Sequence, residues 1–60
     1  MNGTEKHNKM VKIAEDVFKK IGYSEIGANT LAERATRWLE SGRAPRSEAE
    51  REIMNTFDNK

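Results

Sequence analysis

The 60 residues leave room for one hydrophobic core and exclude a second domain or a catalytic insert. Hydrophobic and charged residues each make up 35% of the chain, so the core depends on a few apolar side chains on amphipathic elements. The net charge of +1, from 11 Lys and Arg against 10 Asp and Glu, is too balanced for a nonspecific polyanion binder and too basic for an acidic mimic of DNA.

The chain contains no cysteine, which excludes disulfides and thiolate metal sites and fits a reducing compartment. Its first residues are polar and lack the apolar stretch of a secretory signal. No run approaches the roughly 18 apolar residues of a membrane span. We therefore expect a soluble, cytoplasmic protein that does not engage a membrane.

The first predicted element is an amphipathic helix over about 6–21, preceded by a polar N-terminal arm, 1–5. Its apolar residues fall on one stripe at about 100° per residue. Lys19 and Lys20 suit the negative end of the helix dipole, and Gly22 follows where a left-handed residue is expected. The stripe consists of Met10, Val11, Ile13, Ala14, Val17, Phe18 and Ile21.

The segment from Tyr23 to Ala28 contains Gly27 and no sustained period, so it is predicted to be a loop. Tyr23 and Ile26 are apolar enough to pack beneath this connection. We therefore expect these two side chains to anchor the loop.

The second predicted helix covers about 30–41. Thr30 and Glu33 have the spacing of a capping box, in which each side chain bonds a free backbone N–H near the other residue. Gly42 and then Pro45 supply the stop signal. Its apolar positions are Leu31, Ala35, Trp38 and Leu39.

A third helix is predicted over about 47–57, because Ser47 and Glu50 repeat the capping-box spacing. Three helices with short connections favour an all-α fold, a small three-helix bundle that fills the single domain 1–60. A core this small seldom gives a net folding stability above roughly 3 to 5 kcal/mol without a disulfide or a bound metal. We therefore also predict that a homodimer completes the bundle. The apolar positions of the third helix are Ala49, Ile53, Met54 and Phe57.

Residue types that commonly carry out catalysis are scarce in this chain. His7 is the only histidine and lies near the N-terminus, which disfavours a nucleophilic triad and a zinc site. Glu15 and Asp16 are adjacent, but each has a lysine four residues later and is interpreted as a solvated ion-pair partner. The interior is too small to enclose a pocket of roughly 300 Å³. We predict no enzymatic activity, no catalytic residue, no metal site and no cofactor.

Arginines are the more suggestive feature of the second half of the chain. Arginine binds carboxylates and phosphates through a planar, bidentate fork, so such a group is a candidate interface with protein or nucleic acid. The alternative is a solvated face, since Glu33, Glu48 and Glu50 stand at ordinary ion-pair spacings from three of the arginines. The group comprises Arg34, Arg37, Arg43, Arg46 and Arg51.

Trp38 is the only tryptophan, and we interpret it first as the centre of the core. The alternative is an interface residue, because Trp and Arg are the commonest hot-spot residues and Arg34 and Arg37 stand beside it in the sequence. The candidate partner-binding set is therefore Arg34, Arg37, Trp38, Arg43, Arg46 and Arg51.

The segment 14–35 contains a motif that resembles a known family. Its residues are Ala14, Val17, Phe18, Gly22, Tyr23, Leu31, Ala32, Glu33, Arg34 and Ala35. This order is similar to the opening of TetR-type repressors, and the resemblance implies a helix-turn-helix whose next helix enters the major groove of DNA. The family expects a tight turn after the position of Ala35, whereas 36–40 here continue the helical pattern. Phe18 is also bulky where a small residue is expected. No DNA-contacting residue is carried over.

Three functional hypotheses follow. The first is a non-enzymatic protein-binding module, an adaptor or inhibitor of the kind found among phage-like or bacterial regulatory proteins, with a homodimer as companion. The second is a small helical DNA-binding transcriptional regulator, in which the arginines contact phosphates and affinity falls with salt. The third is a structural subunit of a larger assembly.

Overall fold

Residues 2–59 form three helices, in the order α1 (Asn2–Ile21), α2 (Glu25–Glu40) and α3 (Glu48–Asp58). The computed structural model describes the backbone of 2–59 and the side chains of 5–59. No strand occurs within these residues, so the predicted all-α class is confirmed.

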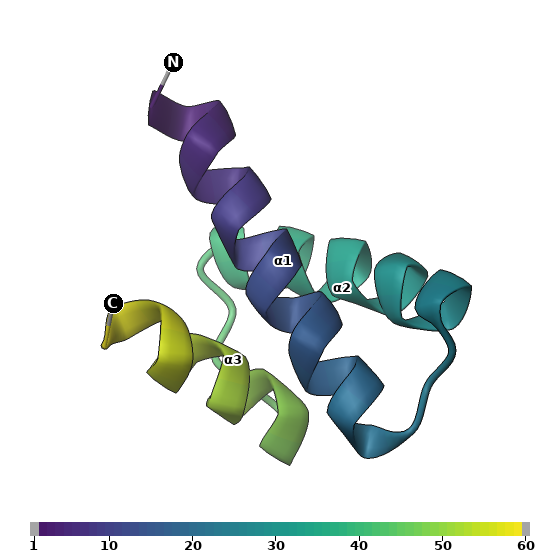
Figure 1. Cartoon of the computed structure of the whole chain (residues 1–60). Helices are drawn as coiled ribbons and strands as arrows, with labels where there is room; N and C mark the ends of the chain where they lie inside the picture. The colour runs from purple at the N-terminus through teal and green to yellow at the C-terminus, as the bar shows by residue number, and fades with distance from the viewer. Residues whose placement is uncertain (1, 60) are drawn as a thin grey trace.

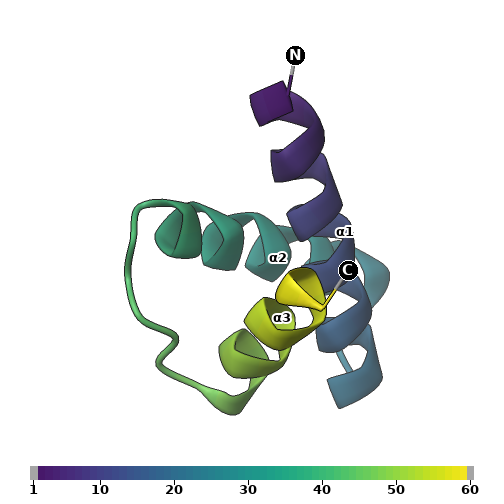
Figure 2. The ribbon, with the colours of Figure 1, turned by 90° about the vertical axis from the view of Figure 1, so that its left-hand side faces the viewer.

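The first helix is the element on which the other two pack. α1 crosses in front of α2 and lies alongside α3 in Figure 1, and its contact with α2 is the more extensive. In Figure 2, α3 lies below α2 and in front of α1, and the 41–47 connection loops out at the left-hand edge. Direct contact between α2 and α3 is slight. The position of α3 is therefore set mainly by α1.

The N-terminal segment differs from the prediction. α1 begins at Asn2, so the backbone of 2–5, predicted as a polar arm, is helical, while Met1 lies outside the described residues. Glu5 stands in the first turn, where the positive end of the helix dipole favours a carboxylate. These first turns project beyond the other helices in both views. Their residues are polar because this part of the helix is surrounded by solvent.

The end of α1 confirms the predicted glycine stop. Gly22 has a φ of 128°, and its N–H donates to the Lys19 carbonyl at 3.0 Å. The N–H of Tyr23 donates to the Phe18 carbonyl at 3.1 Å, which completes a Schellman turn. The Tyr23 and Phe18 rings meet edge to face, with centroids 5.8 Å apart. This aromatic contact is the apolar pair that usually accompanies such a turn.

The start of α2 corrects the prediction of a loop over 23–28. Ser24 is the N-cap, in extended conformation, and its Oγ accepts a hydrogen bond from the N–H of Gly27 at 3.2 Å. The Thr30 hydroxyl instead donates to the Ile26 carbonyl at 3.1 Å, one turn back within the helix. The capping box predicted at Thr30 is therefore wrong, and the helix begins one and a half turns earlier.

The cap of α3 uses the two predicted residues, Ser47 and Glu50, but in a shifted arrangement. The Ser47 Oγ accepts from the N–H of Glu50 at 3.2 Å, and the Glu50 carboxylate accepts from the N–H of Arg46 at 2.9 Å. The carboxylate thus bonds the residue before the N-cap, one position earlier than in the usual capping box. The reciprocal pair fixes the angle at which the 41–47 connection enters α3.

The core is built largely from alanines where α1 meets α2. Small side chains allow two helices to approach closely, so Ala28, Ala32 and Ala35 occupy the centre of the contact face of α2. The larger Leu31 is thereby placed on the flank of the helix, where it is half-buried. The buried hydrophobic residues are Met10, Ala14, Val17, Ala28, Ala32, Ala35, Leu39 and Ile53.

Two residues of the predicted apolar stripes are exposed, while several others are partly buried against the core. Ile21 is exposed, because it stands on the last turn of α1. Trp38 is the other exposed residue. The predicted loop anchor Ile26 is 82% exposed and anchors nothing. Thr36, by contrast, is fully buried, and its hydroxyl has no hydrogen-bond partner among the described residues.

Candidate protein-binding surface

Trp38 is 46% exposed, so the interpretation that placed it at the centre of the core is wrong. It lies about 100° around α2 from the buried Leu39. Because the close approach of α1 requires small residues, the centre of the contact face has no room for an indole. Tryptophan on a flank of this kind presents a large, rigid surface to solvent, which is the arrangement found in interface anchors.

Arg43 covers part of the Trp38 ring. Its guanidinium carbon lies 5.4 Å from the ring centroid, within the range of a cation–π interaction. The backbone between them forms a second Schellman turn, in which Gly42 has a φ of 93° and the Arg43 N–H donates to the Trp38 carbonyl at 3.3 Å. The Ser41 hydroxyl donates to the same carbonyl at 2.7 Å. The predicted glycine stop thus also positions Arg43.

Arg34 lies on the same flank of α2, one turn before Trp38. Residues four apart on a helix differ by about 40° in direction, so the two side chains are neighbours. Arg34 is exposed. Three of the predicted binding residues, Arg34, Trp38 and Arg43, therefore share one flank.

The same flank continues toward the start of α2 through residues that the sequence did not single out. Gly27 and Leu31 stand one turn apart and are both half-buried. The Tyr23 Cδ1 atom lies 3.9 Å from the point that a Cβ on Gly27 would occupy, and Tyr23 is 49% exposed. An aromatic side chain therefore stands at each end of the flank. We name this surface the Trp38 stripe; it consists of Tyr23, Gly27, Leu31, Arg34, Trp38 and Arg43.

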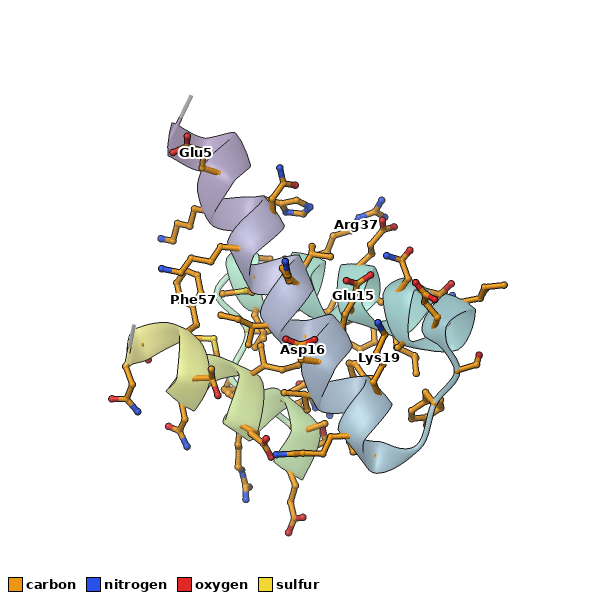
Figure 3. All side chains as sticks on the ribbon, viewed as in Figure 1. Glu5, Glu15, Asp16, Lys19, Arg37 and Phe57 are labelled. Carbon is orange, nitrogen blue, oxygen red and sulfur yellow. The ribbon has the colours of Figure 1, made fainter. Side chains whose placement is uncertain are left out.

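Three predicted binding residues lie away from the Trp38 stripe. Arg37 is about 100° around the helix from Trp38 and projects from α2 away from α3 in Figure 3. Arg46 is exposed in the 41–47 connection, where its backbone N–H serves the cap of α3. Arg51 is exposed on α3, about 160° around that helix from the buried Ile53. The structure therefore does not unite the arginines on one surface.

The ion pairs that would make the arginines a solvated face are not formed. Among the described residues, salt bridges within 4.0 Å join His7 to Glu40 and Lys20 to Glu52, and neither involves an arginine. The Glu50 carboxylate, expected near the Arg46 guanidinium, accepts from its backbone instead. The guanidinium groups of the Trp38 stripe are thus not neutralised by a carboxylate of the described chain.

The ion pairs predicted along α1 are also replaced by contacts between helices. Glu15 points toward α2 in Figure 3 and accepts a hydrogen bond from the Asn29 side-chain amide. Lys20 pairs with Glu52 of α3 instead of Asp16. The neighbouring carboxylates of Glu15 and Asp16 point in different directions in the same view. They do not form a paired acid–base site.

The carboxylates of α2 lie on the opposite side of the helix from the Trp38 stripe. Glu25, Glu33 and Glu40 stand about 140–160° around the helix from Trp38. Glu40 faces α1, since its Oε1 lies 2.9 Å from the Nδ1 of His7. Arg34 therefore lies on the Trp38 side of α2, whereas the acidic residues and Arg37 lie on the other side.

Surface hollows are found elsewhere, including one of about 350 Å³ between the first half of α1 and the ends of α2 and α3. It is an open hollow between helix ends and not a pocket enclosed by the core, so the expectation about enclosed pockets is not tested by it. The amines of Lys6 and Lys9 each lie 5.9 Å from the centroid of the Phe57 ring, which is labelled in Figure 3. The hollow is lined by Lys6, Met10, Leu39, Glu40, Met54, Phe57 and Asp58.

Three further findings bear on the functional class. Within the side chains that the structure describes, no three histidine, cysteine, aspartate or glutamate residues are grouped so as to hold a metal ion. No helix in the described part of the chain is long and apolar enough to cross a membrane. Comparisons with protein families, with curated proteins and with solved structures find no match to this chain. In agreement with the departure from the TetR pattern, α2 runs without a turn through Glu40.

Proposed function

We propose that this protein is a non-enzymatic protein-binding module, an adaptor or inhibitor that engages its partner through the Trp38 stripe. The observation that supports this most directly is the exposed Trp38 ring with the Arg43 guanidinium 5.4 Å from its centroid. Trp and Arg are the residues that most often dominate the energy of protein interfaces. Both are held in place by the Schellman turn, so little ordering entropy is lost on binding.

An adaptor or inhibitor acts by occupying a surface of its partner, for which a rigid helix flank is sufficient. Arg34 adds a cation on the next turn, and Leu31 adds aliphatic surface between the two aromatic ends. Among the charged groups of α1 and α3, Asp16, Lys20 and Glu52 line one open hollow, where Lys20 and Glu52 pair with each other. A regulatory role by binding therefore accounts for the exposed features of the chain better than a reaction does.

Capture from lysate of the source cells tests the proposal. Immobilised wild-type protein is compared with Trp38→Ala and with Ile26→Ala, a matched control that removes an exposed apolar side chain off the Trp38 stripe. We expect at least one protein to be retained by the wild type and the Ile26 variant and lost with Trp38→Ala. Helical circular dichroism of each variant checks that the fold is intact. Identical capture by all three would place the contact elsewhere.

The DNA-binding regulator is distinguished by a second measurement. Anisotropy of labelled random duplex DNA is recorded at roughly 50 and 200 mM salt, the range in which phosphate contacts lose most affinity. We expect no binding at either salt concentration. Binding that weakens steeply with salt and is lost on reversal of Arg34 would replace the protein-binding proposal by the nucleic-acid one.

Self-association into a homodimer, which would complete a three-helix bundle with a second copy, is a companion proposal. It is supported by the small, alanine-rich core and by the exposed Ile21 and Ile26, which lie off the Trp38 stripe. Sedimentation equilibrium over a wide range of protein concentrations tests it. A single monomer mass at every concentration would refute self-association and leave the Trp38 stripe untouched.

A further inference from the structure

We infer that the partner segment recognised by the Trp38 stripe is an acidic amphipathic helix, with an apolar face that packs along α2 and carboxylates that meet Arg34 and Arg43. The inference rests on the proposed protein-binding function and names the chemistry of the partner at that same surface. It follows from the distribution of charge along the stripe, the shape of its apolar surface and the exclusion of a second copy.

The charge of the stripe has one sign. Arg34 and Arg43 are its only charged members, and the carboxylates of α2 lie on the other side of the helix. The 41–47 connection adds Arg46 and contains no acidic residue. A partner that buries this flank must supply carboxylates, since a buried guanidinium without a counter-charge is costly.

The apolar part of the stripe suits a helix. Gly27, Leu31 and Trp38 follow one line along α2, about 16 Å long at 1.5 Å per residue, which is three helical turns. Nothing but Tyr23 and Ser24 lies within 4 Å of the position of a Cβ on Gly27, so a partner backbone can approach closely there. Tyr23 and Trp38 bound this line at its two ends. A helix with apolar residues at i, i+4, i+7 and i+11 spans the same distance.

A second copy of this chain does not fit the stripe. In a two-fold dimer that pairs the stripes antiparallel, Arg34, near the middle of the line, would face Arg34 of the other copy. Arg43 at one end would face Tyr23 at the other, so neither cation would meet an acid. Two guanidinium groups on either side of Trp38, on a chain of net charge +1, are also few for a nucleic-acid site. An acidic protein segment remains the complementary occupant.

Selection from a displayed library of random peptides of about 16 residues, enough for four helical turns, tests this inference. The library is selected against the folded wild-type chain, with Trp38→Ala as the counter-selection. Peptides that survive are synthesised with a fluorescent label, and their affinities are measured by anisotropy. One variant combines Arg34→Glu and Arg43→Glu and reverses both charges of the stripe. The control variant combines Arg37→Glu and Arg51→Glu, which have the same effect on net charge but lie off the stripe.

We expect survivors rich in Asp and Glu at helical spacing from apolar residues, with affinity lowered at least about tenfold by the stripe reversal and little changed in the control variant. Basic versions of the same peptides should bind the stripe reversal in preference to the wild type. Survivors that need Trp38 but show no acidic excess would refute the acidic partner and leave the proposed binding surface standing. A selection with no peptide that depends on Trp38 would overturn both.

Discussion

Arg43 and Trp38 are joined twice, by the guanidinium that lies 5.4 Å from the ring centroid and by the Arg43 N–H that donates to the Trp38 carbonyl at 3.3 Å. Tyr23 and Phe18 stand in the same relation at the end of α1, with a hydrogen bond of 3.1 Å and an edge-to-face ring contact. Each pair closes a Schellman turn, but the second places a cation where the first has a ring. The geometry that ends α2 therefore also shapes the proposed binding surface, independently of any partner.

Replacing Arg43 by alanine tests this double contact. Loss of the cation–π interaction should lower the free energy of unfolding by about 0.5–1 kcal/mol, as at other exposed sites. The uncovered indole should also become more accessible to acrylamide, which is measured directly because Trp38 is the only tryptophan. Arg46→Ala is the control, since only the backbone of Arg46 makes a hydrogen bond to Glu50. Equal quenching in the two variants would show that Arg43 does not cover the ring in solution.

Two glycine substitutions should have opposite effects on stability. Gly42 has a positive φ that alanine adopts only under strain, so Gly42→Ala should destabilise the protein by about 1–2 kcal/mol. Gly27 lies inside α2 with ordinary contact distances for an added Cβ, so Gly27→Ala should stabilise it by about 0.5–1 kcal/mol. Urea unfolding followed by circular dichroism measures both. A stabilising Gly42→Ala would mean that the turn after α2 is not formed as described.

The helix ends show which local signals can be read from a sequence. Gly22 and Gly42 were correctly predicted as stops, because a positive φ is a local requirement that few residues satisfy. The start of α2 was misplaced, because Ser24 and Thr30 both resemble caps and Gly27 appeared to interrupt the helix. Ala28, in the first turn of α2, is fully buried, and burial of this kind is a tertiary effect that periodicity does not reveal.

The candidate surface was only partly predictable for a related reason. Periodicity predicts that large apolar residues are buried, so Trp38 was predicted to lie in the core and Gly27 was given no special role. In the structure the small side chains of Ala32 and Ala35 form the helix contact, which moves the indole to the flank. Arg34 could be grouped with Trp38 from its spacing alone, whereas the position of Arg43 depends on the turn between them.

Removing the Trp38 side chain should cost much less stability than removing a core side chain. Ile53 is fully buried, and Ile53→Ala should lower the free energy of unfolding by about 2–5 kcal/mol, enough to unfold a domain of this size. Trp38→Ala should stay folded, because nearly half of the residue is already in water. Thermal melts followed by circular dichroism compare the two. A Trp38 variant as unstable as the Ile53 variant would return this residue to the core and remove the basis of the binding proposal.

Alanine replacements of the three hydroxyl residues near helix starts should separate true caps from the apparent one. Ser24→Ala and Ser47→Ala should each cost about 1 kcal/mol, because each Oγ accepts from a backbone N–H in the first turn. Thr30→Ala should cost little or be slightly favourable, since alanine is the better helix former and the Thr30 hydroxyl only duplicates a bond to a helix carbonyl. Chemical denaturation gives the three values. A large loss at Thr30 with none at Ser24 would restore the later helix start.

The buried hydroxyl of Thr36 offers the clearest route to a more stable protein. It is fully buried and has no hydrogen-bond partner within the described part of the chain, and burial of an unpaired hydroxyl costs about 1–3 kcal/mol. Valine has nearly the same shape and a similar helix propensity, so Thr36→Val should stabilise the protein by about 1 kcal/mol and raise its melting temperature by about 4–8 °C. Thr36→Ser keeps the hydroxyl and removes the methyl group, so it should destabilise the protein and serves as the control. If valine lowered the melting temperature, the hydroxyl would have to be bonded in solution, most simply to the carbonyl one turn back in α2.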